Sequence, residues 1–191
     1  EQILASIQQH TSNVFTIGNP LGEHTTFGPI ASRQQFERVK SYLDIGQQEG
    51  ADLQILATAG AMPPFREASG YFMQPAIFDN AKNTMRIVQE EIFGPVLSVI
   101  SFKTDDEAIQ LANDVNYGLA ATAWTQNLSR ARRLGRDLEA GSIDICASTT
   151  AAASSSGLSG EPFGASGFGV VGGLRGLDPY TRLKAVQIIT D

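Results

Sequence analysis

The fold is decided by residues 96–146, which read VLSVISFKTDDEAIQLANDVNYGLAATAWTQNLSRARRLGRDLEAGSIDIC. In this stretch three apolar, β-prone runs alternate with two amphipathic helical runs. Each helical run follows a capping residue, Thr104 or Asn127, whose side chain can accept a hydrogen bond from a free backbone N–H in the first turn. Strands that alternate with helices predict βαβ crossovers. We therefore expect an α/β protein with a largely parallel sheet and helices on both of its faces.

The same alternation extends upstream. Ser32 and Gln35 have the spacing of a reciprocal capping box, in which the serine caps a helix and the glutamine side chain reaches back to the cap. A strand is expected over 52–59, and an extended segment is expected over 71–78. Pro75 lies inside that segment and cannot donate to a strand ladder, so we expect the segment to be an edge strand or irregular.

The chain ends in an apolar run over 183–190, which predicts a last strand. Such a strand needs a partner, because an exposed strand edge promotes association. It either completes a sheet in this chain or pairs with an edge in another subunit, and we expect a homo-oligomer. We therefore divide the chain into a main domain, 1–178, and a C-terminal oligomerisation strand, 179–191.

Length and composition exclude several classes of protein. The 191 residues suffice for one large domain with its own core, and 14 Lys and Arg against 20 Asp and Glu give a net charge of −6. This acidic balance disfavours a general nucleic-acid binder. No apolar run approaches the ~18 residues of a membrane span, and no signal peptide is visible. We therefore expect neither nucleic acid nor a membrane as a partner.

The single cysteine, Cys146, excludes an internal disulfide framework and a Cys-rich zinc site. It fits a reducing compartment, and we expect a cytoplasmic protein. At the end of an apolar strand this thiol is expected to behave as a small buried hydrophobe. His10 and His24 are too loosely placed for a metal site and are expected to be solvated.

The chain starts at Glu1 without a methionine, and Ile3, Leu4 and Ile7 already have helical spacing with no cap before them. A helix that lacks its upstream end indicates a processed chain or a piece of a longer protein. We therefore expect that a targeting signal or catalytic residues can lie upstream of Glu1.

Residues 167–172, GFGVVG, match the glycine spacing of a dinucleotide-binding fingerprint. Their context is wrong, because a true fingerprint follows an apolar strand and opens a helix. Here Ser and Gly precede the motif, and Gly173, Gly176 and Pro179 follow it. We expect these glycines to serve a tight, close-packed turn instead.

The segment 89–96, QEEIFGPV, allows two interpretations. In one, Glu90 and Glu91 form a solvated turn and Phe93 is a core residue. In the other, the segment recognises a ribose, because a carboxylate offers two acceptors to vicinal hydroxyl donors and an aromatic side chain can hold a flat ring. The residue chemistry alone leaves both interpretations open.

Residues 90–96 also resemble a signature of the NAD(P)-dependent aldehyde dehydrogenase superfamily. Further pieces resemble that family's pattern in the same order: Gly18-Asn19-Pro20-Leu21, Gly28-Pro29-Ile30, Gly70-Tyr71-Phe72-Met73-Gln74-Pro75, Tyr117-Gly118-Leu119-Ala120-Ala121, Ala140-Gly141, Pro162-Phe163-Gly164, and Tyr180-Thr181 with Lys184. The resemblance covers nearly the whole chain. It implies the later part of the family's catalytic domain over 1–178, followed by a strand of the oligomerisation sheet.

The family oxidises an aldehyde: a cysteine thiolate attacks the carbonyl, a hydride passes to the nicotinamide of NAD or NADP, and a glutamate base assists hydrolysis of the thioester. In the family these catalytic groups and the dinucleotide-binding half lie upstream of the region that Glu1 matches. The resemblance therefore implies no catalytic residue in this chain, which alone should be inactive. An aldehyde substrate is implied only for the full-length parent enzyme.

Five residues take roles from the resemblance. Glu91 resembles the residue that binds the nicotinamide ribose hydroxyls, and Phe93 the residue that packs beside that ribose and ring. Gln35 and Arg38 fall where family members contact the cofactor ribose. Phe163 matches an aromatic that lines the aldehyde pocket, where it would form an apolar wall and exclude water.

The chain departs from the family pattern in two places. Cys146 stands where the family usually has asparagine, so it is not the catalytic cysteine. Residues 164–171 lack the family's lysine and its later charged pair, and an Ala/Ser-rich run over 147–160 precedes them. Two other classes remain as alternatives: a non-catalytic remnant that binds partners through its terminal strand, and a nucleotide-binding module independent of catalysis.

Overall fold

The structure is a computed structural model that describes residues 2–59, 70–147 and 160–190. The chain divides into two compact units, Glu1–Ser101 and Phe102–Asp191, and each is described by itself. Most of the Ala/Ser-rich run over 147–160 lies outside the described residues. The division of the chain at residue 178 remains a prediction.

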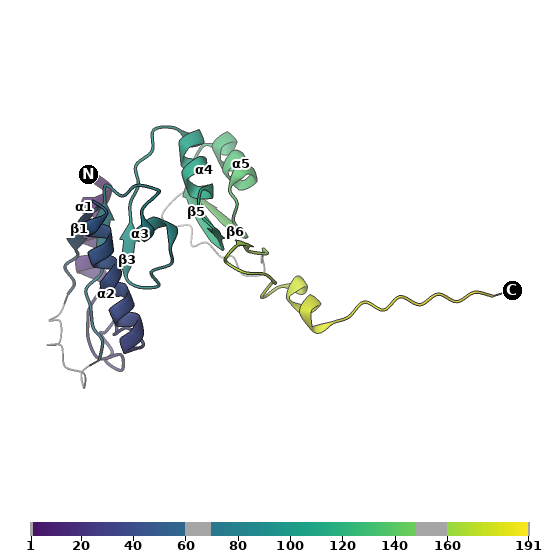
Figure 1. The fold of residues 1–191 in the computed structure, drawn as a ribbon, viewed down its shortest axis with the longest axis horizontal. Helices are drawn as coiled ribbons and strands as arrows, with labels where there is room; N and C mark the ends of the chain where they lie inside the picture. Colours follow the sequence, from purple (N-terminus) through teal and green to yellow (C-terminus); the bar gives the residue numbers. More distant parts are fainter. Residues whose placement is uncertain (1, 60–69, 148–159, 191) are drawn as a thin grey trace. The chain divides into compact units, whose positions relative to one another are not determined.

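The described part of the first unit contains a three-stranded sheet and helices (Figure 1). Its elements are α1 (Gln2–Val14), α2 (Arg33–Gln48), β1 (Asp52–Ile55), β2 (Ala76–Asp79), α3 (Arg86–Gln89) and β3 (Val96–Ser98). The strand order is β1-β2-β3, with β1 antiparallel and β3 parallel to β2. Because α3 and β3 flank residues 90–95, the segment with two interpretations lies at the entrance to β3.

The position of Pro75 corrects one expectation. The segment over 71–78 was expected to be an edge strand or irregular: residues 72–75 lie outside any strand, so this part is irregular, but β2 itself is the central strand and not an edge. Pro75 lies one residue before β2, so the ladder does not need its missing N–H. Its carbonyl instead accepts a hydrogen bond from the Leu56 N–H at 2.8 Å, and the Ala76 N–H donates to the carbonyl of Pro95 at 2.9 Å.

The core of the first unit lies where α2 packs on the sheet. Val39 and Tyr42 of α2 are buried in one cluster with Phe78 of β2 and Ile87 of α3. Gly46 permits the close approach, because a Cβ there would lie 2.4 Å from the Phe78 Cζ atom. This packing fixes the residues of α2 relative to α3 and to the entrance of β3.

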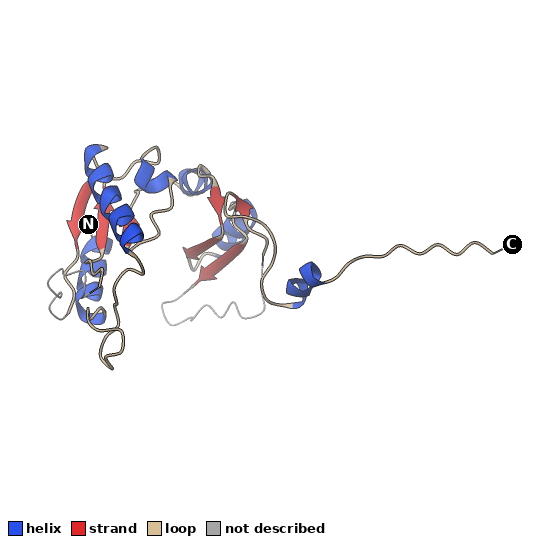
Figure 2. Ribbon diagram, turned by 60° about the horizontal axis from the view of Figure 1, so that its bottom comes forward, coloured by secondary structure: helices blue, strands red, loops and turns tan. Residues whose placement is uncertain are grey.

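The second unit contains short helices and two-stranded sheets (Figure 2). Its elements are α4 (Asp105–Asn113), β4 (Tyr117–Gly118), β5 (Ala120–Trp124), α5 (Leu128–Asp137), β6 (Ser142–Cys146), β7 (Phe163–Gly164) and the 3-10 helix η2 (Leu174–Tyr180). The strands β5 and β6 are parallel, and β4 and β7 are antiparallel. The α/β class is confirmed: the three-stranded sheet of the first unit is mixed, and the second unit has one parallel and one antiparallel pair of strands.

The predicted helix caps are present, because each cap depends only on residues that are close in sequence. The side chains of Ser32, Thr104 and Asn127 accept hydrogen bonds from the backbone N–H groups of Gln35, Glu107 and Arg130 at 3.2, 3.1 and 3.0 Å. The caps therefore define where α2, α4 and α5 begin.

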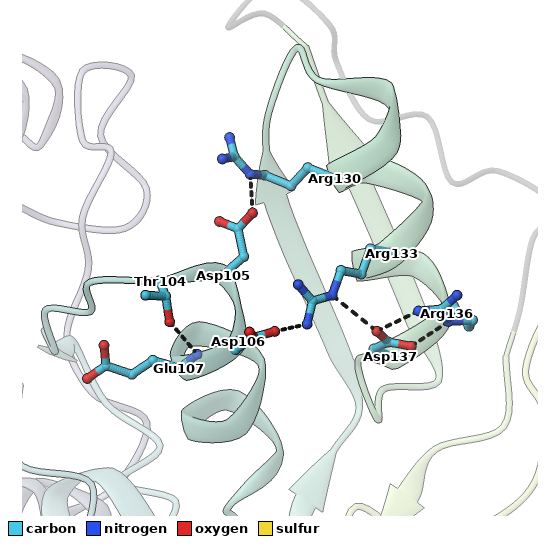
Figure 3. Close-up of polar contacts among 8 residues, drawn as sticks. All are labelled: Thr104, Asp105, Asp106, Glu107, Arg130, Arg133, Arg136 and Asp137. Carbon is cyan, nitrogen blue, oxygen red and sulfur yellow. Dashed lines mark hydrogen bonds and ion pairs between the residues drawn. The ribbon is translucent and has the colours of Figure 1, made fainter.

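Charged side chains join α4 to α5 (Figure 3). Arg130 pairs with Asp105, with 2.7 Å between Nε and Oδ2. Arg133 pairs with Asp106 and also contacts Asp137 within its own helix, with 3.5 Å between Nε and Oδ2. These contacts hold the two helices side by side at the protein surface.

The C-terminal segment 181–190 is extended but forms no strand ladder in the described part of the chain (Figure 1). The expectation that it completes a sheet within this chain is therefore not met there, and its pairing with another subunit remains a prediction. Large apolar side chains in it are exposed: Leu183, Val186, Ile188 and Ile189. In the described residues, no helix has the length and apolar character that crossing a bilayer requires.

Candidate functional site

The candidate site is built around residues 90–94, which connect α3 to β3 and are called the 90–94 turn below. Phe93 in this turn has a φ of +56°, in the left-handed region that aromatic residues rarely adopt. It is also 81% exposed. The interpretation of Phe93 as a core residue is therefore wrong. An exposed aromatic ring on a constrained backbone is more typical of a binding surface than of packing.

Glu90 is fully engaged by neighbouring side chains. The Tyr42 hydroxyl donates to Glu90 Oε2 at 2.5 Å. The Arg86 guanidinium donates to both carboxylate oxygens, from Nε to Oε1 at 2.9 Å and from Nη2 to Oε2 at 3.1 Å. Hydrogen bonds from Arg86 and then from Tyr42 lower the pKa of Glu90 to about 2. Glu90 is therefore ionised at neutral pH and held in one place.

Glu91 differs from its neighbour. Its side chain is exposed and makes no hydrogen bond or ion pair within the described residues. Its backbone is fixed, because its carbonyl accepts a 2.7 Å hydrogen bond from Arg38 Nη2. The adjacent carboxylates thus divide into one that is bound by the protein and one that is available to a ligand.

The side chains of Gln35 and Arg38 lie beside the 90–94 turn. Gln35 Nε2 donates to the carbonyls of Ile92 and Phe93 at 2.9 and 2.8 Å. Together with the bond from Arg38 to Glu91, these contacts hold three consecutive backbone carbonyls. They also correct one expectation: the Gln35 side chain does not reach back to Ser32, so only the serine half of the capping box forms.

The structure thus brings together Gln35, Arg38, Glu91 and Phe93, the residues for which a cofactor role was expected. It also adds two residues that the sequence analysis missed, Tyr42 and Arg86. The only signal for them is spacing on a helix: Arg38 and Tyr42 are separated by four residues, as are Arg86 and Glu90. Such spacing does not show that Tyr42 and Arg86 both bind the Glu90 carboxylate.

Phe163 lies in the second unit, in the short strand β7. It is opposite Gly118 of β4 in the ladder and is 47% exposed. A Cβ at Gly118 would lie 2.7 Å from the Phe163 Cβ, so the strand pair is closely packed there. Phe163 is accessible enough to contact a ligand. The role of Phe163 in an aldehyde pocket remains a prediction.

The cysteine and the two histidines have the exposures that were expected of them. Cys146 is buried as a free thiol at the end of β6, and His10 and His24 are exposed. Within the described ranges, no cluster of His, Cys, Asp and Glu could hold a metal ion.

The GFGVVG run follows the two-residue strand β7 and precedes the 3-10 helix η2, which is not the strand–turn–α-helix context of a dinucleotide fingerprint. Gly167, Gly169 and Gly172 have positive φ values of 104°, 92° and 92°, as a turn requires. Close packing is not found, because no atom would lie within 4 Å of a Cβ at these three positions.

Comparison with known proteins identifies the family. The aldehyde dehydrogenase family matches residues 1–186. The chain is 37% identical over 191 residues to an aldehyde dehydrogenase-like protein of Schizosaccharomyces pombe, covering 98% of this chain and 36% of that protein. It also resembles the P. syringae indole-3-acetaldehyde dehydrogenase AldA solved with NAD+ and IAA, at 42% identity and a TM-score of 0.79, over 90% of this chain and 33% of that one.

An aldehyde dehydrogenase from Bacillus cereus, solved as an NAD+ complex, is similar at 31% identity and a TM-score of 0.81, covering 97% of this chain and 36% of that one. The chain therefore belongs to the aldehyde dehydrogenase family, as the sequence resemblance predicted. It spans about a third of the length of these relatives, between 33% and 36%.

Proposed function

We propose that this chain is part of an NAD(P)-dependent aldehyde dehydrogenase, in which it supplies contacts to the nicotinamide ribose and one wall of the aldehyde pocket. The observation that carries the proposal is the pairing of an available carboxylate with an exposed ring. Glu91 has no side-chain partner among the described residues, and Phe93, two residues later, is 81% exposed. The NAD+ complexes of the similar structures support the choice of cofactor.

The residues of the turn fit a ribose and a flat ring. The Glu91 carboxylate is acceptor-only and can take hydrogen bonds from two vicinal hydroxyl donors. Gln35 and Arg38 hold the backbone of the turn, so little conformational freedom is lost when a ligand binds. When bound, the cofactor accepts the hydride from the substrate. The exposed Phe93 ring would pack against the ribose and the nicotinamide ring.

The nucleophile and the general base then belong to parts of the enzyme outside residues 1–191. In this proposal Phe163 gives the aldehyde pocket an apolar surface. The enzyme is cytoplasmic, which the free buried thiol of Cys146 supports.

The test uses the natural protein that contains this chain, captured by an antibody and weighed by mass spectrometry. We expect a mass well above 20.4 kDa and NAD(P)-dependent oxidation of aldehydes. In that protein, Glu91→Gln should raise the Kd of the cofactor and leave the KM of the aldehyde unchanged. Glu23→Gln, which alters another exposed carboxylate, is the matched control. A natural mass near 20.4 kDa with no cofactor binding would refute the proposal.

We also propose that the segment 183–190 pairs with a second copy of the protein to form a homo-oligomer. Its support is the exposure of Val186, Ile188 and Ile189, which are 70%, 82% and 83% exposed. Apolar side chains this exposed in an extended segment favour burial against a partner strand. Sedimentation of the natural protein should show an oligomer, and Ile188→Asp should shift it toward the monomer. A wild-type monomer would contradict this assignment.

A further inference from the structure

A chain of hydrogen bonds connects Glu90 to the backbone of Glu91 by way of α2. Arg86 and the Tyr42 hydroxyl hold the Glu90 carboxylate. The same hydroxyl accepts a bond from Arg38 Nη2 at 3.3 Å, and that nitrogen also donates to the Glu91 carbonyl at 2.7 Å. Three successive hydrogen bonds therefore connect the side chain of Glu90 to the backbone carbonyl of Glu91.

The direction of every bond in this path is fixed by its chemistry. A guanidinium has only donors, and an ionised carboxylate has only acceptors. The Tyr42 hydroxyl has one proton, which it gives to Glu90, so only its lone pairs face Arg38. No member can reverse its bond without losing a partner, and the path therefore has a single arrangement.

The aromatic ring of Tyr42 also contacts both arginines of the network. The guanidinium carbons of Arg38 and Arg86 lie 5.3 and 5.7 Å from its centroid. Both distances allow cation–π attraction. The residue is only 4% exposed. A buried tyrosine that two cations contact offers a fixed point from which Arg38 can be positioned.

We propose that Tyr42 and Glu90 are positioning residues for Glu91: Glu90 orients the Tyr42 hydroxyl, the hydroxyl places the Arg38 guanidinium, and Arg38 sets the backbone from which the Glu91 carboxylate reaches the cofactor ribose. This inference rests on the proposed function, because it assigns the network to cofactor binding. It also explains the two successive glutamates: the first fixes the geometry and the second contacts the ligand.

A network that only stabilised the fold would give a different experimental result. If Tyr42 only stabilised α2 against α3, its loss would lower the melting temperature, and its effect on cofactor affinity would be independent of Glu91. If it acts through Glu91, its effect on affinity should disappear once the Glu91 carboxylate is gone.

The experiment is a double-mutant cycle in the natural full-length protein, with Tyr42→Phe, Glu91→Gln and both together. The Kd of NAD+ is measured by calorimetry, and amide hydrogen exchange is followed without cofactor in a peptide covering the 90–94 turn. Tyr71→Phe removes a hydroxyl from a tyrosine of the same unit outside the network and is the control. Arg38→Lys, on the exposed face of α2, serves as a second test should Tyr42→Phe fold poorly.

We expect Tyr42→Phe to raise the Kd by roughly 3- to 10-fold, the effect of losing one polar contact. Exchange in the turn should become faster, and Tyr71→Phe should match the wild type. The double variant should bind NAD+ within about 2-fold of Glu91→Gln alone. Arg38→Lys should likewise raise the Kd, because lysine cannot reproduce the guanidinium geometry.

Multiplicative effects in the double variant, or an unchanged Kd in Tyr42→Phe, would overturn the positioning role and leave the proposed function standing. A wild-type protein that does not bind NAD+ would overturn the proposed function, and the positioning role would fall with it. The two failures are thus separated by the behaviour of the wild type.

Discussion

Gly94 lies directly against the side chain of Val39. A Cβ at Gly94 would lie 2.4 Å from Val39 Cγ2 and 2.9 Å from Cγ1. Val39 is completely buried in the core of the first unit and cannot move aside. The packing of α2 therefore requires glycine at the end of the 90–94 turn. The residue of α2 that it meets, Val39, lies one helical turn after Gln35.

We expect Gly94→Ala to lower the free energy of unfolding by about 1 to 3 kcal/mol, the usual cost of overpacking a filled core. The same change at Gly135, in α5, should stabilise the protein by roughly 0.5 to 1 kcal/mol, because a Cβ there meets only Ile145 Cδ1 at 3.7 Å and alanine favours the helix. Urea unfolding of both variants checks the pair. A Gly94→Ala variant as stable as the wild type would show that α2 can withdraw from the turn.

The exposed ring of Phe93 should matter for binding and little for stability. Phe93→Gly removes a ring that is 81% exposed and relieves a φ of +56°, so the free energy of unfolding should change by less than about 1 kcal/mol. Cofactor affinity should fall if, as proposed, this ring packs beside the nicotinamide. Phe168→Gly, at another exposed phenylalanine, should leave affinity unchanged. Equal affinity in the wild type and Phe93→Gly would argue against a ligand at the ring.

Glu90 should make stability depend on pH in the acid range. Arg86 and Tyr42 hold its pKa at about 2, below the ordinary 4.5, so folding favours the ionised form. The resulting stabilisation is fully present above pH 4.5 and is lost as the pH falls from 4.5 to about 2. The melting temperatures of the wild type and Glu90→Gln should therefore differ at pH 7 and converge toward pH 2. A gap that stays constant over this range would contradict the assignment.

The hydrogen bond from Tyr42 to Glu90 also affects the pKa of Tyr42. The hydrogen bond to Glu90 is the largest cause that raises the pKa of Tyr42 above its ordinary 10.0. Spectroscopic titration should therefore find that the Tyr42 hydroxyl ionises at a higher pH in the wild type than in Glu90→Gln.

The ion pairs between α4 and α5 should contribute modestly and depend on salt. Arg133 contacts Asp106 and Asp137, but its side chain remains 40% exposed, so solvent screens both pairs. Arg133→Gln should lower the free energy of unfolding by no more than about 1 kcal/mol in low salt, and by less in high salt. Arg132→Gln is the control, because Arg132 forms no ion pair among the described residues. A loss independent of salt would indicate that Arg133 acts through packing.

Local sequence predicts the ends of helices well and the partners of side chains poorly. Ser32, Thr104 and Asn127 cap their helices as predicted, because each cap bonds to a backbone N–H three residues away. The Gln35 side chain has the spacing to return to Ser32, yet it donates to carbonyls 57 and 58 residues away. Tertiary packing of α2 decides between these partners.

The same distinction applies to the strands and to the site. Pro75 indicated an edge strand or an irregular segment; the chain is irregular up to this proline, but the strand that begins one residue later is central. The pair of Glu90 and Glu91 was visible as a candidate ribose site. The resemblance to the family singled out Glu91 as the ribose ligand, but the residue chemistry alone did not show which carboxylate is free, because Glu90 is engaged by Tyr42, which is 48 residues away.

The two hydrogen bonds from Gln35 have a consequence for how the protein folds. They close loops of 57 and 58 residues, and they hold the carbonyls of Ile92 and Phe93 where the backbone of Phe93 has a positive φ. Closing such loops costs chain entropy that is repaid only when α2 docks. The 90–94 turn should therefore acquire its shape late, in the same cooperative step that completes the core. If the turn binds a dinucleotide as proposed, a nascent or partly unfolded chain would bind it weakly, and ligand binding would select the fully folded form.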